Sequence, residues 1–138
     1  MMKEKKETSL ITKTNILAHF FYRAFLLRLS NSKMRQEILD EVQISKHNEQ
    51  IIDDIEEIIA NMGELKTIIF EVFTKDWTWE RIPALIQALL IVGAYQITMT
   101  DEPKALIINE IVNLTKSLEP DFEFGFVNAV LDKINKED

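Results

Sequence analysis

The sequence ALIQALLIVGAYQI occupies residues 84–97 and contains no charged side chain. Pro83 precedes it, and proline is favoured at the start of a helix because its missing N–H would have no helical partner there. Apolar residues surround nearly the whole helical circumference, with Gln87, Gly93 and Gln96 as the main exceptions. A helix that is apolar on all sides is typical of the centre of a domain. We therefore expect residues 84–97 to form a buried central helix.

Amphipathic patterns on both sides of this segment predict the helices that cover it. Apolar residues recur there at a helical spacing, and no stretch of any length alternates as a strand would. About seven helices therefore predict an all-α bundle in a single domain of residues 1–138. Thr12 or Thr14 is expected to cap the first helix, and Gly63 is expected to end the third. The expected helices are 12–29, 33–44, 46–62, 65–74, 84–97, one that starts after Thr100-Asp101-Glu102-Pro103, and one with the apolar stripe Val127, Val130, Leu131 and Ile134.

The composition excludes several classes of protein. The chain has 138 residues, 46% apolar side chains, three glycines, three prolines and no cysteine. Without cysteine it has neither a disulfide scaffold nor a Cys-ligated metal site, and the few Gly and Pro leave little room for the tight turns of an all-β sandwich. The most apolar window, residues 82–95, is shorter than the roughly 20 residues that span a bilayer. We expect a soluble cytoplasmic protein with no membrane partner.

Charge is distributed unevenly along the chain. The whole chain has a net charge of −7, but residues 1–35 hold eight cations and two glutamates, a net charge of +6, and the remaining residues carry −13. A basic segment on an acidic body is typical of an arm that contacts a polyanion, although a solvated terminus that happens to be rich in lysine is an alternative. The cations are Lys3, Lys5, Lys6, Lys13, Arg23, Arg28, Lys33 and Arg35.

Sequence signals for catalysis are nearly absent. The chain has no Gly-rich phosphate loop, no Gly-x-Ser-x-Gly turn and no Cys nucleophile, and His19 and His47 are not spaced as a metal pair. Four carboxylates between residues 53 and 57 resemble ligands of a hard cation, but they lie opposite the isoleucine stripe of their helix and are expected to face water. The sequence therefore predicts neither an enzyme nor a metal or cofactor site.

Aromatic residues near the C-terminus have a spacing that a single helix face cannot accommodate. Phe122, Phe124 and Phe126 alternate, so at least one of them is expected to be exposed, while the other two are expected in the core. An exposed aromatic beside a basic surface can stack a base of single-stranded RNA. Trp77 and Trp79 precede the central helix and are expected to pack between helices.

Three consecutive blocks between residues 77 and 134 carry a resemblance to a known family. They are Trp77, Glu80, Arg81 and Ile82 leading into Ala94-Tyr95; then Pro103, Ile108-Asn109-Glu110 and Lys116; and finally FVNAVLDKI at residues 126–134. In their order and spacing these blocks resemble the NusB family of transcription antitermination factors, whose ending is Phe-Val-Asn-Gly-Val-Leu-Asp. The resemblance implies two three-helix sub-bundles with a linking helix, and no catalytic activity.

The resemblance also implies partners and a binding surface. NusB proteins bind the boxA segment of nascent RNA together with NusE, a small-subunit ribosomal protein, and this complex joins RNA polymerase to sustain transcription of ribosomal RNA operons. In the family, the RNA site is a basic N-terminal segment and the adjoining surface of the bundle, which corresponds here to a basic arm at about residues 1–13 and the start of the bundle. The expected RNA-binding residues are Lys3, Lys5, Lys6, Lys13 and Arg23 for phosphates, and Tyr22 or Phe126 for base stacking.

The chain departs from the family pattern at several positions. The arginine-rich start of the family's first helix is Thr12-Lys13-Thr14-Asn15 here. In the central helix a family Arg position is Ile91, and the family Glu that follows the Tyr is Gln96, next to Tyr95. Ala129 stands where the family ending has Gly. These differences leave an alternative open, in which the chain is a NusB-fold protein-interaction module, as a homodimer, that has lost RNA binding.

Overall fold

The structure is a computed structural model that describes residues 9–73 and 76–136. Within these ranges the chain forms seven α-helices and one short 3-10 helix, η1, and contains no strand. The all-α prediction is therefore confirmed. The elements are α1 (Leu10–Leu26), α2 (Asn31–Leu39), α3 (Glu49–Ala60), α4 (Met62–Glu71), η1 (Trp79–Arg81), α5 (Ala84–Met99), α6 (Lys104–Leu118) and α7 (Phe124–Asp132).

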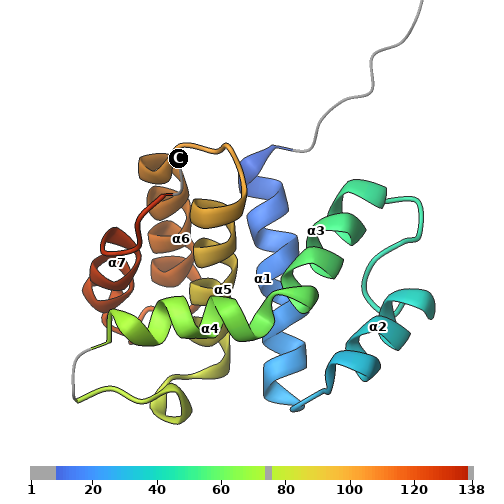
Figure 1. The fold of residues 1–138 in the computed structure, drawn as a ribbon, viewed down its shortest axis with the longest axis horizontal. Coiled ribbons are helices and arrows are strands. Elements are labelled where there is room, and N and C mark those ends of the chain that lie inside the picture. The colour runs from blue at the N-terminus through green and yellow to red at the C-terminus, as the bar shows by residue number, and fades with distance from the viewer. Residues whose placement is uncertain (1–8, 74–75, 137–138) are drawn as a thin grey trace, which may run out of the picture.

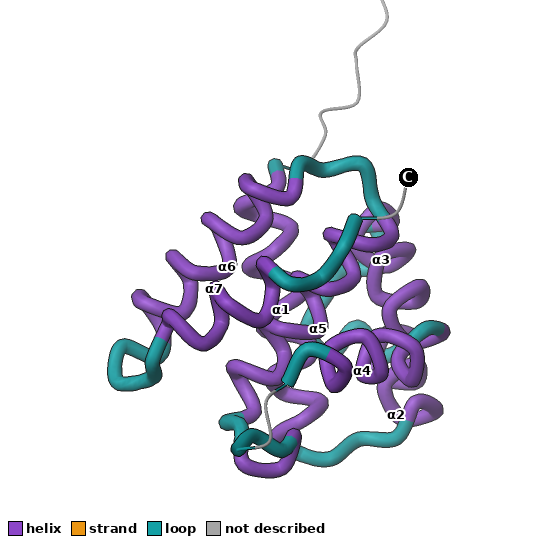
Figure 2. The backbone as a smooth tube through the Cα atoms, turned by 60° about the vertical axis from the view of Figure 1, so that its left-hand side comes forward, coloured by secondary structure: helices purple, strands orange, loops and turns teal. Residues whose placement is uncertain are grey.

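Two groups of three helices are joined by a helix that crosses between them. Helices α1, α2 and α3 form one group, α5, α6 and α7 form the other, and α4 runs from the end of α3 across α5 toward α7 (Figure 1). The two groups meet where α1 packs against α5. Between the helices, the described chain consists of loops and turns (Figure 2). This arrangement matches the expected two sub-bundles and linking helix.

Helix α5 lies at the centre of the hydrophobic core. Twelve of its sixteen residues are buried, and it contacts α1, α4, α6 and α7, which confirms the prediction of a buried central helix. At Gly93 a Cβ atom would lie 2.9 Å from Leu131 Cδ2, so the absence of a side chain there lets α7 approach closely. In the part of the chain that the structure describes, every helix is too short or too polar to cross a bilayer.

The ends of α1 differ from the prediction because other residues satisfy the terminal backbone groups. Ser9, rather than Thr12 or Thr14, is the N-cap, and its Oγ accepts a hydrogen bond from the Thr12 N–H at 3.2 Å. At the other end Arg28 has a φ of 56°, and the Leu29 N–H bonds back to the Ala24 carbonyl at 2.9 Å. This left-handed turn ends the helix at Leu26, three residues before the predicted end.

The predicted end of α3 at Gly63 is also wrong. Helix α3 ends at Ala60 and α4 begins at Met62, so Gly63 lies in the first turn of α4. The break falls at Asn61, whose side-chain Nδ2 donates to the Glu57 carbonyl at 2.8 Å. That bond satisfies a carbonyl of the last turn of α3, a role that the sequence pattern had suggested for a glycine.

Helix α2 is shorter than the predicted range 33–44. The Ser30 Oγ accepts a hydrogen bond from the Lys33 N–H at 3.1 Å, so the helix begins at Asn31. It ends at Leu39, and Glu41 then has a φ of 54°. A residue in the left-handed region cannot continue a right-handed helix, which explains the early end.

Candidate nucleic-acid interface

The start of α1 adjoins the segment for which the sequence predicts RNA binding. Lys3, Lys5 and Lys6 lie outside the described residues, so their part of the prediction stays a prediction. Residues 10–13, at the end of the segment expected to be the basic arm, form the first turn of α1. The described part of the predicted site therefore consists of α1 and the C-terminal segment around Phe126.

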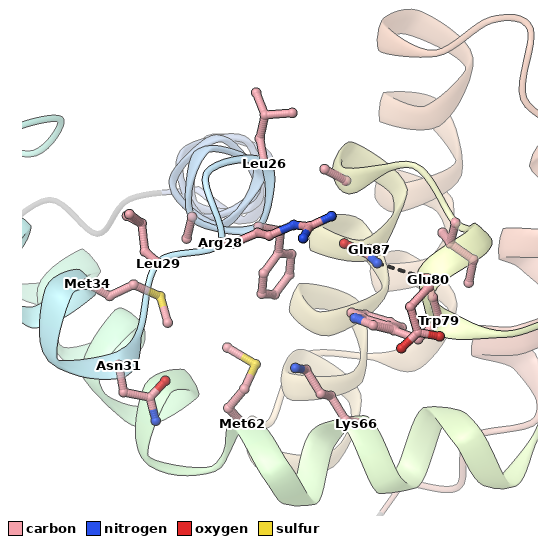
Figure 3. A pocket seen from close by; sticks show the side chains of 14 residues that line it. Leu26, Arg28, Leu29, Asn31, Met34, Met62, Lys66, Trp79, Glu80 and Gln87 are labelled. Carbon is pink, nitrogen blue, oxygen red and sulfur yellow. Dashed lines mark hydrogen bonds between the residues drawn. The ribbon is translucent and has the colours of Figure 1, made fainter.

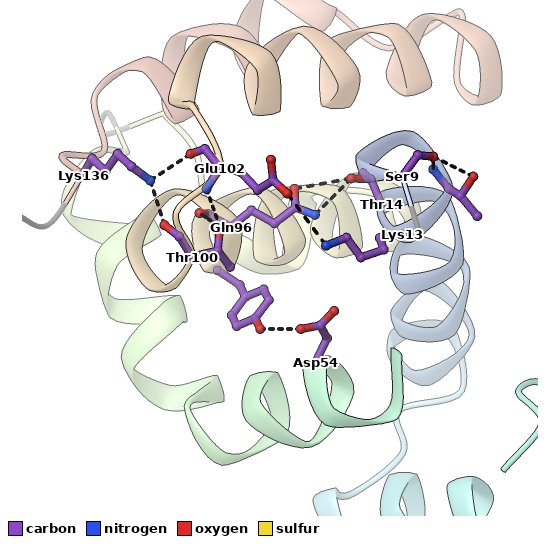
Figure 4. Close-up of polar contacts among 10 residues, drawn as sticks. Ser9, Lys13, Thr14, Asp54, Gln96, Thr100, Glu102 and Lys136 are labelled. Carbon is purple, nitrogen blue, oxygen red and sulfur yellow. Dashed lines mark hydrogen bonds and ion pairs between the residues drawn. The ribbon is translucent and has the colours of Figure 1, made fainter. Parts of the chain in front are cut away.

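Lys13 lies on α1 beside a carboxylate from the connection between α5 and α6. Its Nζ is 3.8 Å from Glu102 Oε2, and the Lys13 side chain is 19% exposed (Figure 4). The same connection is held by Lys136, whose Nζ donates to the Thr100 carbonyl at 2.8 Å and to the Glu102 carbonyl at 2.9 Å. Lys13 therefore presents a partly covered and partly neutralised charge at this surface.

Arg23 forms an ion pair with Glu37 of α2. Arg23 Nε lies 3.2 Å from Glu37 Oε1, and Nη2 lies 3.2 Å from Oε2, which is the two-pronged geometry that guanidinium groups make with carboxylates. Glu37 is buried, whereas the Arg23 side chain is 42% exposed. The hydrogen bonds to Glu37 raise the pKa of Arg23, so it stays charged. This ion pair joins α1 to α2. The carboxylate of Glu37 partly neutralises Arg23, which the sequence predicts to contact an RNA phosphate.

Tyr22 is a solvent-exposed member of the predicted set. Its side chain is 36% exposed, on the same face of α1 as the exposed Ile11 and Leu26. An aromatic ring with a free face on a helix surface is the geometry that stacking on a single-stranded base requires. The stacking role of Tyr22 stays a prediction.

Phe126 instead takes part in a cluster of aromatic rings. Its ring centroid lies 4.2 Å from that of Trp77, 5.9 Å from that of Phe73 and 5.9 Å from that of Phe122. The packing of Trp77 expected from the sequence is therefore present, and two of the three alternating phenylalanines are partly buried, as expected. The neighbouring rings occupy much of the surface of Phe126, which favours a packing role for this residue.

The alternating spacing did not identify which phenylalanine is exposed. Phe124 is 46% exposed, and the Lys116 Nζ lies 4.5 Å from the centroid of its ring. A cation above an exposed ring is a contact that α6 and α7 form only when they are folded together. The sequence shows that one aromatic must face outward, but it does not show that Lys116 covers it.

Three of the four carboxylates of α3 that were expected to face water, Asp53, Glu56 and Glu57, are exposed, whereas Asp54 is half-buried. The Tyr95 Oη lies 2.8 Å from Asp54 Oδ1, which Figure 4 shows, and 3.0 Å from Glu57 Oε1, so both acids contact α5. Burial raises the pKa of Asp54, and burial together with the two carboxylates raises the pKa of Tyr95. Within residues 9–73 and 76–136, no three His, Cys, Asp or Glu side chains group as metal ligands. These acids fasten α3 to α5.

Two departures from the family pattern lie in contact with each other. Gln96 Nε2 donates to Thr14 Oγ1 at 3.0 Å, and both side chains are buried between α1 and α5 (Figure 4). Position 14 therefore faces the interior. The side chain of residue 14 is therefore not part of the outer surface of α1.

Comparison with known proteins places this fold in a family. The sequence model of the NusB family matches residues 15–136. The transcription antitermination protein NusB of Sulfurovum sp. (strain NBC37-1) is 33% identical over 105 residues, which cover 76% of this chain and 81% of that protein. The protein of the same name from Fusobacterium nucleatum is 34% identical over 114 residues, covering 83% and 71%, and that from Campylobacter jejuni is 32% identical over 114 residues, covering 82% and 86%. The resemblance carried by residues 77–134 thus extends to the N-terminal half, and the chain belongs to the NusB family.

Proposed function

We propose that this chain is a non-enzymatic, RNA-binding transcription antitermination factor that acts with NusE on boxA-type RNA and supports ribosomal RNA transcription. The observation that carries the proposal is the match of residues 15–136 to the NusB family. Relatives with about a third of their residues identical bear the name transcription antitermination protein NusB. In this role the chain joins the RNA polymerase antitermination complex, and it is cytoplasmic, where that polymerase works.

We place the RNA on the outer face of α1 and on the basic segment before it. Lys13 and Arg23 each have a carboxylate partner, so the three lysines Lys3, Lys5 and Lys6 supply most of the charge for phosphate contacts. The open face of Tyr22 is available to stack a base. Phe126 packs against Trp77, and we assign it a supporting role behind this surface.

NusE is expected to strengthen RNA binding. Lysine ammonium groups are point charges without the two-pronged geometry of arginine, so the basic segment alone should bind RNA weakly at physiological salt. If NusE and RNA occupy one composite surface, each must increase the affinity for the other by the same factor, because binding linkage is reciprocal. We therefore expect weak binding to RNA alone, measurable binding to NusE alone, and a tighter ternary complex.

The test is a titration of labelled boxA-like RNA with the full chain, with and without NusE, at several salt concentrations. Deletion of residues 1–6 should weaken RNA binding and flatten the salt dependence, since each phosphate contact on single-stranded RNA contributes a slope of about −0.7. Lys33 lies on the exposed surface of α2 and serves as the control. Lys33→Gln should change neither the RNA affinity nor its salt dependence. An unaltered affinity after the deletion would refute the placement of RNA on this segment. The absence of any NusE effect, with a stable homodimer in sedimentation, would favour the interaction-module alternative.

A further inference from the structure

A cavity of about 540 Å³ lies where the C-terminal end of α1 meets α2, α4 and the start of α5 (Figure 3). Its volume falls within the roughly 300–1,000 Å³ of sites that bind small molecules. Apolar and aromatic side chains form much of its lining, among them Phe25, Met34, Met62 and Trp79. None of its lining residues belongs to the RNA-contact set predicted from the sequence.

The charged groups that line this cavity favour an anionic ligand. They are Arg28, Lys66 and Glu80, which gives the lining a net charge of +1 in a chain whose net charge is −7. Arg28 and Lys66 extend into the cavity from opposite sides (Figure 3). The Lys66 Nζ lies 5.9 Å from the ring centroid of Phe25 and 5.7 Å from that of Trp79, so a cation and two aromatic rings face the same space.

Arg28 adopts a backbone conformation that favours glycine. Its φ is 56°, in the left-handed region, directly after the C-cap Leu27 of α1. Glycine is the usual residue at this position because other side chains lose stability in the left-handed conformation. The arginine at this position extends its side chain into the cavity.

Two amide side chains complete the polar lining. Asn31 is the first residue of α2, and Gln87 of α5 donates its Nε2 hydrogen to the Trp79 carbonyl at 2.8 Å, which holds the amide group at the cavity wall. An amide offers both a donor and an acceptor, the two groups that the edge of a nucleobase requires. Aromatic rings, amides and two cations thus converge on one space of the size of a small ligand.

We propose that this cavity binds a single nucleotide, with the base against the aromatic side chains and the phosphate between Arg28 and Lys66. The proposal rests on the proposed function for the source of that nucleotide, which is the RNA that lies along α1. Tyr22 and Leu26 are one helical turn apart on the exposed face of α1, and Leu26 lines the cavity, so the RNA-contact face leads directly to it. This continuity favours an RNA nucleotide over an acidic peptide.

The first test measures the indole N–H resonance of Trp79 by NMR in the isotope-labelled full chain, assigned by its presence in the Trp77→Phe variant. Titration with AMP or UMP should shift this resonance saturably, whereas adenosine should bind more weakly because it has no phosphate. A response to inorganic phosphate equal to that for AMP would overturn the proposal, since the base would contribute nothing. A response only to a peptide rich in Glu and Phe, or no response to any of the probes, would overturn it as well.

Variants of the cavity separate ligand binding from folding. Arg28→Gly should weaken AMP binding about tenfold, because a hydrogen bond between charged groups is lost, and yet raise the melting temperature by relieving the left-handed backbone. Glu80→Gln should tighten binding by removing the carboxylate from the lining. Arg35→Ala, an exposed arginine of α2 that pairs with Glu56, is the matched control and should not change AMP binding. Unchanged AMP binding in Arg28→Gly would refute the proposed phosphate contact.

Titration with RNA distinguishes failure of this proposal from failure of the proposed function. If RNA binds and Arg28→Gly leaves its affinity unchanged, the cavity takes no RNA nucleotide, although the function can still hold. If the full chain binds no boxA-like RNA even with NusE, the proposed function fails, and the Trp79 response to AMP still decides whether the cavity binds nucleotides. Deletion of residues 1–6 should weaken RNA binding without altering the response to AMP.

Discussion

Replacing Tyr95 with phenylalanine would remove one hydroxyl group from the contact between α3 and α5. In the structure this hydroxyl lies 2.8 Å from Asp54 Oδ1 and 3.0 Å from Glu57 Oε1, and the Tyr95 side chain is buried. A hydroxyl has a single hydrogen to donate, so the two carboxylates share one donor. The variant would leave both acids beside a ring that offers them no hydrogen bond.

The expected loss follows from the type of bond and from the exposure of the acids. A hydrogen bond to a charged group contributes roughly 1.5–3 kcal/mol to stability. Asp54 is half-buried and Glu57 is exposed, so water can replace part of the lost interaction, and the aromatic ring remains in place without leaving a cavity. We therefore expect Tyr95→Phe to lower the free energy of unfolding by about 1–2 kcal/mol.

Urea unfolding followed by circular dichroism measures this loss as a lower midpoint at an unchanged slope m. Tyr22→Phe is the matched control, because Tyr22 is 36% exposed, and its effect should stay within about 0.5 kcal/mol. A double-mutant cycle with Asp54→Asn should show that the two effects are coupled. Equal midpoints for Tyr95→Phe and the unmodified chain, or additive effects in the cycle, would refute the argument.

Three further substitutions test the core and its polar contacts. Burial raises the pKa of Asp54, so the protonated form stabilises the folded state at low pH, and this contribution is lost as pH rises through the folded pKa. Asp54→Asn should therefore be more stable than the unmodified chain near neutral pH, and this gain should disappear toward pH 3.8. A gain in stability that does not depend on pH would contradict this reasoning. Leu89→Ala in α5 should lower the free energy of unfolding by about 2–5 kcal/mol in urea, whereas Leu39→Ala, at a side chain that is 75% exposed, should change it by less than about 0.5 kcal/mol. Thr14→Val leaves the buried amide of Gln96 without its partner and should lower the free energy of unfolding by about 1–3 kcal/mol, measured by thermal unfolding. The double variant with Gln96→Leu should lose less stability than Thr14→Val alone. A larger loss of stability in the double variant would count against the buried pair.

The fold was predictable where a single strong pattern decided it. Residues 84–97 are apolar on every side, and a helix of that composition is stable only in the interior, so its place at the centre followed from the sequence. Helix ends depended on competition between neighbouring groups. Ser9 caps α1 although Thr12 and Thr14 are also suitable residue types, and Asn61 ends α3 although Gly63 lies two residues later. Residue propensities alone do not show which of several neighbouring residues will cap or end a helix.

The candidate site was predictable as a region, but the partners of its residues were not. Helical spacing places Lys13 and Arg23 at the edge of the apolar stripe of α1, where the structure also has them. Their carboxylate partners come from other elements, Glu102 from the connection between α5 and α6 and Glu37 from α2. No local pattern in the sequence pairs these residues, because the contacts exist only once the helices have packed.

These ion pairs determine how strongly RNA binding should depend on salt. If only Lys3, Lys5 and Lys6 contact phosphates, these three contacts predict that the logarithm of the binding constant falls with the logarithm of the salt concentration with a slope of about −2 for single-stranded RNA. If Lys13 and Arg23 leave their carboxylate partners and bind phosphates as well, five contacts predict a slope of about −3.5. We expect the shallower value, because Glu37 is buried and would lose its two-pronged partner if Arg23 turned toward RNA. Arg23→Gln should then leave the slope unchanged while it lowers the melting temperature, and a slope that became less steep by about 0.7 in this variant would show that Arg23 contacts a phosphate directly.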